Sequence, residues 1–348
     1  MSQDIVLTVD YHDRNCVVRR FNGATGEERV LSIETTADNL RRLVASARAE
    51  VGAKGRVVWI QESTTGWARV QALLTPHAEV LLANVVQMPL PPKARRRKTD
   101  KIDTARLQRE YFNGQLPLAH QPSRWWRELR RVVGYRENLV ARRTALRNWI
   151  NRYLAHETWR DRDNLWSGVG LVRLKAIVDS ASPRDALVLA GKLDELGRIA
   201  EYLEAVEAEL VAVAAECDDA RRLDAIRGIG VVSAVSIVAR IGPVARFKNA
   251  EHLIAFAGLA PGLQQSDGSR RNGRIGGGGT DKHLRHYLIE ATIWARQIAR
   301  YRPTYERVEK RRGKKIARVV VARLLVRSIY KMLKDGLTFQ PATTAALA

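Results

Sequence analysis

The order of strand-like and helical patterns in the first 90 residues places the tightest limit on the fold. Short apolar runs bounded by polar or turn residues predict five strands, at 5–9, 15–21, 28–33, 56–60 and 80–86. Apolar residues at helical spacing predict a helix before each of the last two strands, at 37–51 and 67–74. Three strands joined by short turns, followed by helix, strand, helix and strand, favour a mixed sheet over an all-parallel one. The sequence therefore predicts an α/β domain at the N-terminus.

A segment rich in proline and positive charge interrupts this pattern. Three prolines within 89–92 cannot continue a helix or a central strand. The dense positive charge that follows is a candidate nucleic-acid contact and includes Arg95, Arg96, Arg97 and Lys98. Thr99 can cap a helix that runs over 100–112.

Most of the remaining chain has a helical pattern. Apolar and arginine residues mix at helical spacing over 125–154, and the pattern continues over 186–217. In the second stretch the apolar positions recur every three or four residues, at Leu189, Leu193, Leu196, Ile199, Leu203, Val206 and Leu210. This spacing predicts a coiled-coil-like helical hairpin, and a plain helical bundle is an equal alternative.

Two glycines separate a short helical segment from a second helix expected at 231–241. Gly228 and Gly230 expose backbone N–H groups at a helix N-terminus, an arrangement that suits a phosphate. The pattern resembles the helix-hairpin-helix element of DNA-handling proteins, which grips the backbone without reading sequence. Ordinary helical hairpins also carry a Gly-x-Gly turn, so both interpretations stay open.

A polar, glycine-rich and basic segment at 264–274 is expected to form a loop. Either it wraps a phosphodiester or it is a plain flexible surface loop, and its candidate phosphate ligands are Arg270, Arg271 and Arg274. Four glycines at 276–279 precede a helix expected at 281–301, and an amphipathic stretch covers 319–333. We expect the last residues, 341–348, to form a disordered tail.

The charge of the chain indicates its partner. Lys and Arg number 59 against 37 Asp and Glu, a formal charge of +22. Such an excess repels itself in a compact protein, and nucleic acid is the commonest polyanion that balances it. A ribosome-associated or merely solvated basic protein is the alternative. Cys16 and Cys217 are too few for a disulfide framework or a cysteine-type zinc site.

No part of the sequence indicates a membrane or a secretory pathway. No apolar run approaches the roughly 20 residues that span a bilayer. The N-terminus lacks the basic start and apolar stretch of a signal peptide. We therefore expect a cytoplasmic, nucleoid-associated protein with no membrane partner.

Four carboxylates stand at positions suited to a metal ion. Asp10 ends the first strand, Glu62 ends the fourth, and Asp100 and Asp103 begin the helix after the basic run. Residues three apart share a helix face, and carboxylates at adjacent strand ends can point to the same place. Hard oxygen donors suit Mg²⁺ or Mn²⁺ rather than zinc. Each acid alone is more often an ordinary surface carboxylate, but four in this order are far more specific. Two such ions can activate a nucleophile and stabilise the leaving oxygen of a phosphoryl transfer.

This set of acids resembles that of the ribonuclease-H-like nucleases, in the branch of the Holliday-junction resolvases. A narrower resemblance covers about residues 5 to 335 and is to the DEDD-type insertion-sequence transposases, also called bridge-RNA-guided serine recombinases, with which Piv-type DNA invertases belong. In the N-terminal half it rests on Val9-Asp10, on 61–64 (QEST) and on 98–106 (KTDKIDTAR). In the C-terminal half it rests on 226–230 (IRGIG), 256–261 (FAGLAP), 266–268 (SDG) and Leu284-Arg285.

The resemblance implies a fold, a site and partners. It implies a resolvase-like N-terminal domain in which the catalytic acids Asp10, Glu62, Asp100 and Asp103 bind Mg²⁺ or Mn²⁺. It implies a helical hairpin leading to a C-terminal domain whose Ser266 attacks a DNA phosphate and forms a covalent phosphoserine intermediate. It further implies a homo-oligomer, a dimer or tetramer with composite active sites, that holds donor and target DNA and a noncoding guide RNA. The implied divisions are 1–115, 120–218 and 219–340.

The chain departs from the family pattern near two of these residues. The segment after Glu62 has an apparent extra residue, which need not disturb the carboxylate. After Ser266 the family often has a second small residue, whereas Asp267 intervenes here and Ser269 is a second candidate nucleophile. The distance from the segment 258–261 favours Ser266.

Three other functions compete with this interpretation. A resolvase-like nuclease would cut with water and need no serine, and the segment around Ser266 counts against it. A non-enzymatic organiser of nucleic acid would not need four intact acids. An actin-like ATPase would need a glycine-rich phosphate loop after the first strand, and 11–13 (YHD) is not one.

Overall fold

The structure, a computed structural model, describes residues 3–51, 55–64, 66–88, 100–156, 164–266, 269–277 and 279–341. Within these ranges it describes the backbone alone for 100–101, 262–266 and 269–274. By its internal contacts the chain divides into two units, Met1–Gln121 and Pro122–Ala348, each with its own hydrophobic core. The predicted subdivision of the second unit at 218 stays a prediction, and the predicted tail lies outside the described residues except for residue 341.

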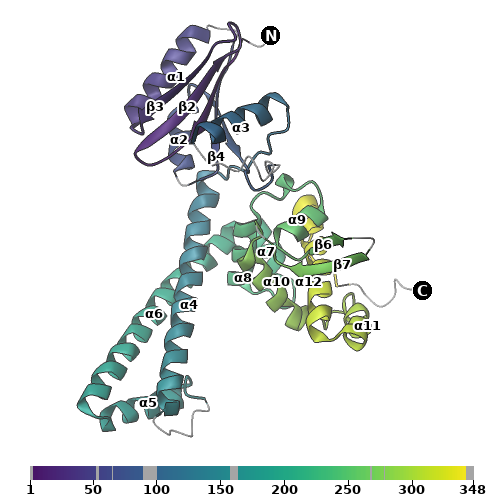
Figure 1. Cartoon of the computed structure of the whole chain (residues 1–348). Helices are drawn as coiled ribbons and strands as arrows, with labels where there is room; N and C mark the ends of the chain where they lie inside the picture. The colour runs from purple at the N-terminus through teal and green to yellow at the C-terminus, as the bar shows by residue number, and fades with distance from the viewer. Residues whose placement is uncertain are drawn as a thin grey trace. The chain divides into compact units, whose positions relative to one another are not determined.

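A mixed five-stranded sheet forms the centre of the first unit (Figure 1). Its strands are β1 (Ile5–Asp10), β2 (Asn15–Asn22), β3 (Glu28–Glu34), β4 (Val57–Glu62) and β5 (Glu79–Ala83). They lie in the order β3-β2-β1-β4-β5, with β1 antiparallel to β2 and parallel to β4. The predicted mixed sheet is confirmed. The last strand is shorter than predicted, because turn hydrogen bonds from Gln87 to Asn84 and from Met88 to Val85 follow it.

Helices cover both faces of this sheet at the predicted positions. On one face, α1 (Ala37–Val51) and α2 (Trp67–Leu74) pack against alternate residues of β1 and β4, such as Leu7 and Trp59. On the other face, α3 (Asp100–Phe112) packs Leu107 against Val6 and Ile60. Alternate residues of a strand point to opposite faces, so the continuous apolar runs of β1 and β4 are explained by a sheet covered on both sides.

Two long antiparallel helices begin the second unit. They are α4 (Arg124–His156) and α6 (Pro183–Glu216), joined through α5 (Gly168–Ser180) at the far end of the hairpin (Figure 1). Leu139 and Leu146 of α4 pack on Ile199 and Leu203 of α6. An ion pair between Arg136 and Glu207, 2.7 Å apart, spans the two helices. The predicted helical hairpin is thus confirmed, whereas α5 was not anticipated.

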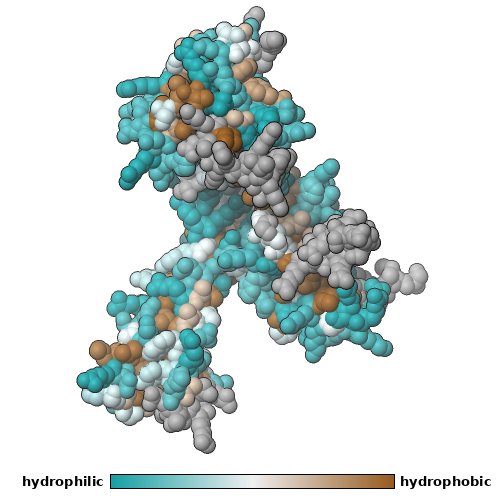
Figure 2. All heavy atoms as spheres, viewed as in Figure 1, coloured by the Kyte–Doolittle hydropathy of each residue, from teal (hydrophilic) through white to brown (hydrophobic). Residues whose placement is uncertain are grey.

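Hydrophobic side chains gather at the far end of this hairpin (Figure 2). Val172 on α5 is 71% exposed and Leu187 near the start of α6 is 76% exposed. Val169, Leu171 and Val188 are exposed beside them in the chain. Adjacent exposed apolar residues are more common on association surfaces than on the free surface of a monomer.

The rest of the second unit is a mainly helical core. Its helices are α7 (Asp218–Asp224), α8 (Val231–Ile241), η2 (Val244–Arg246), α9 (Ala250–Phe256), α10 (Lys282–Ala295), α11 (Arg302–Arg312) and α12 (Lys314–Asp335). Helix α8 is buried along most of its length and lies in one cluster with α10 and α12. No helix in the described ranges is long and apolar enough to cross a membrane.

Two predictions for this region are wrong. The segment 264–274, expected as a loop, lies in a two-stranded antiparallel hairpin of β6 (Pro261–Ser266) and β7 (Ser269–Ile275). A single helix expected at 281–301 is instead α10, which ends at Ala295, followed by turns that lead to α11. Helix α10 ends here because Gln297 and Ile298 donate hydrogen bonds to carbonyls three residues back, instead of the four residues of an α-helix.

Candidate functional site

Asp10 and Glu62 end two neighbouring parallel strands. β1 and β4 pair in register up to the residue before each of these acids, so the two acids are the next opposing positions. Val6 and Ile60, which alternate with them along the strands, belong to the apolar cluster beneath α3. Since alternate residues share a face, Asp10 and Glu62 project to the α3 face of the sheet.

Helix α3 brings the third predicted acid to the same face. Leu107 is 2% exposed and packs on Val6 and Ile60, which fixes the side of α3 that meets the sheet. Asp103 precedes Leu107 by one turn, so it lies on the same side of the helix and is partly buried. The backbone of Asp100 begins the helix one turn earlier still, and its side chain is outside the described residues. The i and i+3 placement of the two aspartates is therefore confirmed for the backbone.

The sequence did not single out a histidine beside the first acid. His12 Nε2 lies 3.4 Å from Asp10 Oδ1, and the two side chains are 60% and 15% exposed. His12 follows the strand by two residues, and the only signal for it in the sequence was this proximity. His12 is therefore a further polar side chain beside Asp10 at the end of β1.

The donor set fits a divalent ion, but the full ligand set stays a prediction. Among the described side chains, no three His, Cys, Asp or Glu form a group that could hold a metal ion. The side chain of Asp100 is not among those described. Carboxylate oxygens from Asp10, Glu62 and Asp103, which approach one sheet face, are the donors that Mg²⁺ and Mn²⁺ prefer.

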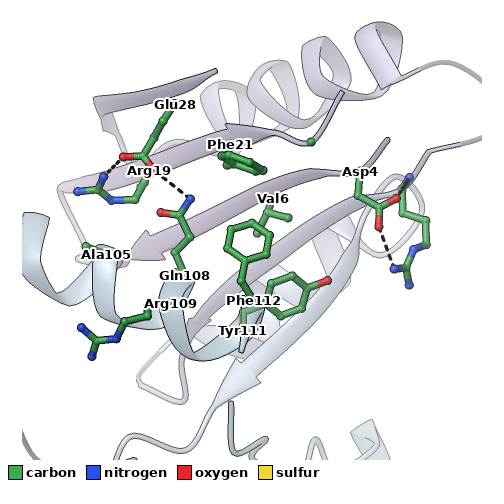
Figure 3. Close-up of a pocket in the computed structure, with 12 residues that line it drawn as sticks. Asp4, Val6, Arg19, Phe21, Glu28, Ala105, Gln108, Arg109, Tyr111 and Phe112 are labelled. Carbon is green, nitrogen blue, oxygen red and sulfur yellow. Dashed lines mark hydrogen bonds and ion pairs between the residues drawn. The ribbon is translucent and has the colours of Figure 1, made fainter. Parts of the chain in front are cut away.

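A groove runs beside α3 on this same face (Figure 3). Its volume is about 930 Å³, and its α3 residues extend from Ala105 to Phe112. In the middle of the groove, the rings of Phe112 and of Phe21 on β2 meet edge-to-face, with their centroids 5.0 Å apart. Arg19 pairs with Glu28, to which Gln108 also donates a hydrogen bond of 3.1 Å. The groove is therefore apolar in the middle with its charges already paired, so it does not resemble a phosphate site.

The predicted serine nucleophile lies at the end of the β6–β7 hairpin. Ser266 is the last residue of β6 and pairs with Ser269, the first residue of β7. The two candidate serines therefore occupy opposing backbone positions. Arg270 and Arg271 pair with Gln265 and Gln264, and Arg274 lies further along β7. The four predicted ligands Arg95, Arg96, Arg97 and Lys98 lie outside the described residues.

The two glycines of the predicted phosphate contact have different surroundings. Gly228 has φ +100°, and a Cβ there would lie 2.7 Å from the carbonyl oxygen of Ala291 on α10. Gly230 begins α8 as its N-cap with φ −87°, and a Cβ there would meet open space. Close packing thus accounts for Gly228, while the backbone near Gly230 is open. Phosphate contact at either glycine stays a prediction.

We expect Gly228→Ala to destabilise the protein far more than Gly230→Ala. The first change forces a left-handed backbone and a clash with α10, which together cost about 2 kcal/mol or more of unfolding free energy. The second alters a helix N-cap and costs at most about 1 kcal/mol. Urea unfolding of the two variants measures the difference. Equal losses would contradict a packing role for Gly228.

Two transposase family models match the chain one after the other. A DEDD transposase model of IS110 elements matches residues 8–157, and the model described as Transposase IS116/IS110/IS902 family matches residues 220–308. The chain belongs with the IS110-family transposases. The first match spans Asp10, Glu62, Asp100 and Asp103, and the second spans Ser266. Transposases of this family catalyse the cleavage and joining of DNA strands.

Three curated relatives are similar over part of their length. The transposase for insertion sequence element IS1111A of Coxiella burnetii is 27% identical over 182 residues, 51% of this chain and 50% of that protein. A probable family 20 transposase of Pseudomonas aeruginosa is 28% identical over 173 residues, 47% and 48% of the two chains. An uncharacterized 43.6 kDa protein of insertion element IS110 from Streptomyces coelicolor is 25% identical over 163 residues, 46% and 40%. The aligned part thus spans about half the length of each relative.

Proposed function

We propose that this chain is an insertion-sequence transposase that cuts and rejoins DNA at the α3 face of its sheet. The observation that carries the proposal is the convergence of three acids on that face. Asp10 and Glu62 end neighbouring parallel strands, and Asp103 lies on the side of α3 that packs against them. The family matches and the charge of +22 support a DNA substrate.

The proposed N-terminal fold is ribonuclease-H-like. The order β3-β2-β1-β4-β5, with an antiparallel meander on one side and parallel strands on the other, supports it. Asp10, Glu62, Asp100 and Asp103 would hold Mg²⁺ or Mn²⁺, which when bound lowers the pKa of an attacking hydroxyl and offsets charge on the phosphate. The acids themselves repel a phosphodiester, so a divalent cation and the basic surroundings are needed for DNA to approach.

The proposed chemistry includes a covalent step at the serine. Oγ of Ser266 attacks the phosphorus of a DNA phosphodiester, the bond to one strand oxygen breaks, and the serine proton passes to that oxygen. A hydroxyl of a second DNA strand then attacks the phosphoserine, which joins the strands and restores the serine. The family resemblance and the position of Ser266 inside the second matched region support this step.

The proposed assembly is a homo-oligomer, a dimer or tetramer, with acids from one protomer and serine from another. Apolar side chains exposed at the far end of the hairpin, such as Val172 and Leu187, support self-association. A noncoding guide RNA that pairs with donor and target DNA completes the proposal. The large positive charge supports binding of more than one nucleic-acid strand.

A strand-joining assay tests this function. The protein is incubated with donor DNA, target DNA, Mg²⁺ and RNA transcribed from the noncoding DNA beside the gene. We expect a joined DNA product when all components are present and no joined product when a chelator removes Mg²⁺. When the RNA is omitted, we expect the joined product only at the background level. If the DNA strands are joined equally well without RNA, the proposed RNA guidance is wrong and the rest of the proposed function stands. Cutting without joining or adduct would identify a resolvase-like nuclease instead.

A further inference from the structure

A second, positively lined cavity lies in the C-terminal unit, away from the serine hairpin in the chain. Its volume is about 690 Å³, within the range of roughly 300–1,000 Å³ that ligand sites occupy. Its walls come from α12, from α11 and the turn before it, and from the segment 337–340 after α12. Helices α11 and α12 are labelled in Figure 1. None of the residues assigned so far to catalysis or DNA binding lines it.

The charges around this cavity are almost all positive. Arg300, Arg327 and Lys331 line it, and its described lining residues include no Asp or Glu. Arg327 pairs with Glu251 at 2.8 Å, but Arg323 approaches the same carboxylate at 3.8 Å. Arg300 and Lys331 have no ion-pair partner in the described part of the chain. The cations therefore repel one another, and a bound anion would relieve that repulsion.

Hydroxyl groups line the same cavity between the cations. Tyr301 is 1% exposed, and burial raises its pKa, so the phenol keeps its proton. Its hydroxyl donates a hydrogen bond of 2.8 Å to Oγ of Ser328. The Ser328 oxygen thus acts as acceptor and its own proton is available to a ligand. Thr304 and Thr338 add two more hydroxyls at the walls.

An aromatic wall distinguishes this cavity from a chance cluster of surface cations. The Phe339 ring lies 6.5 Å from that of Tyr301 with an interplanar angle of 36°. Leu324 and Met332 of α12 add apolar surface. Cations scattered on a solvated face would have neither a concave aromatic wall nor hydroxyl donors between them. Phosphate oxygens suit the cations and hydroxyls, and a sugar or base suits the aromatic wall.

We propose that this cavity binds one phosphate of a nucleic-acid strand together with the adjoining nucleoside. Arg300 and Lys331 would pair with the phosphate, Ser328 would donate a hydrogen bond to it, and Phe339 would contact the sugar or base. The proposal rests on the proposed function, because the nucleic acid handled by a transposase supplies the strand.

Binding of labelled single strands tests the cavity without involving catalysis. Fluorescence anisotropy in chelator compares DNA and RNA of one sequence, since either strand can supply the phosphate. In R300Q/K331Q both exposed cations of the cavity become neutral. We expect about a tenfold loss of affinity, and a salt dependence whose slope falls by about 0.7 for each lost phosphate contact. The strand that shows the larger loss is the one that the cavity holds.

A matched variant separates this site from overall charge. In K175Q/R184Q two exposed cations on α5 and near the start of α6 are neutralised, which changes the net charge equally. We expect less than a threefold loss there. Thr338→Glu, which places a carboxylate at the exposed wall, should reproduce the R300Q/K331Q loss. If both double variants lose the same amount of affinity, the proposed binding site in the cavity is wrong and the proposed function still stands. A wild-type chain that binds neither strand would overturn both.

Discussion

We expect Asp103→Asn to abolish DNA strand cleavage and to leave DNA binding intact. Asn keeps the size of Asp but lacks the charge that holds a divalent cation. Asp103 lies one turn before Leu107 on the side of α3 that packs against the sheet, beside the strand ends of Asp10 and Glu62. Loss of an outer partner of a metal ligand costs about 10- to 100-fold, so loss of a ligand should lower the cleavage rate by more than about a hundredfold. The measurement is the rate of cleavage of labelled DNA in Mg²⁺.

A matched aspartate provides the control. Asp38 lies in the first turn of α1, on the opposite face of the sheet, and its side chain is 76% exposed. Asp38→Asn changes the net charge by the same amount and should cleave as the wild type does. DNA affinity measured in chelator should be unchanged or slightly raised in Asp103→Asn, because a repulsive charge has gone. If both Asp100→Asn and Asp103→Asn cleave normally, the metal site is wrong.

Much of this acid-bearing face could be predicted because its pattern is local. The apolar runs of β1 and β4 each end at a carboxylate, and a parallel pair brings two such ends to one sheet edge. Thr99 before Asp100 gave the start of α3, and the helical period then placed Asp103 one turn later. Helices at 37–51 and 67–74 were marked by their apolar spacing. None of these inferences needed a long-range contact.

The serine hairpin was missed because its residues carry no strand signal. The paired residues of this hairpin are almost all polar, such as Gln264, Gln265, Arg270 and Arg271. No alternation of apolar and polar residues therefore marks β6 and β7. The same limit applies to the cavity by α12. Ser328 follows Arg300 by 28 residues, and Phe339 follows Ser328 by 11. Only the packing of α12 and of the segment after it brings these three residues to one cavity. Such sites depend on tertiary contacts that a single sequence does not encode locally.

We expect Ser266→Ala to eliminate the proposed covalent protein–DNA adduct and strand joining. An alanine has no oxygen to attack phosphorus, so the phosphoserine ester cannot form. Removal of a nucleophilic serine costs roughly a thousandfold or more in rate. The adduct is measured with end-labelled DNA in Mg²⁺, quenched with detergent and separated under denaturing conditions. We expect a labelled protein band with the wild type and none with this variant.

Ser269→Ala is the decisive control, since its backbone lies directly opposite Ser266 in the hairpin. Both changes remove one hydroxyl from the same residue pair and disturb the strand pairing alike, so a difference between them reports chemistry rather than folding. With Ser266 as nucleophile, Ser269→Ala keeps the adduct. If instead Ser269→Ala loses it and Ser266→Ala keeps it, the covalent mechanism stands with the other serine. If both variants cleave DNA normally and the wild type forms no adduct, water is the nucleophile. The acids of the α3 face would then act as those of a nuclease, and the serine hairpin would have a binding role only.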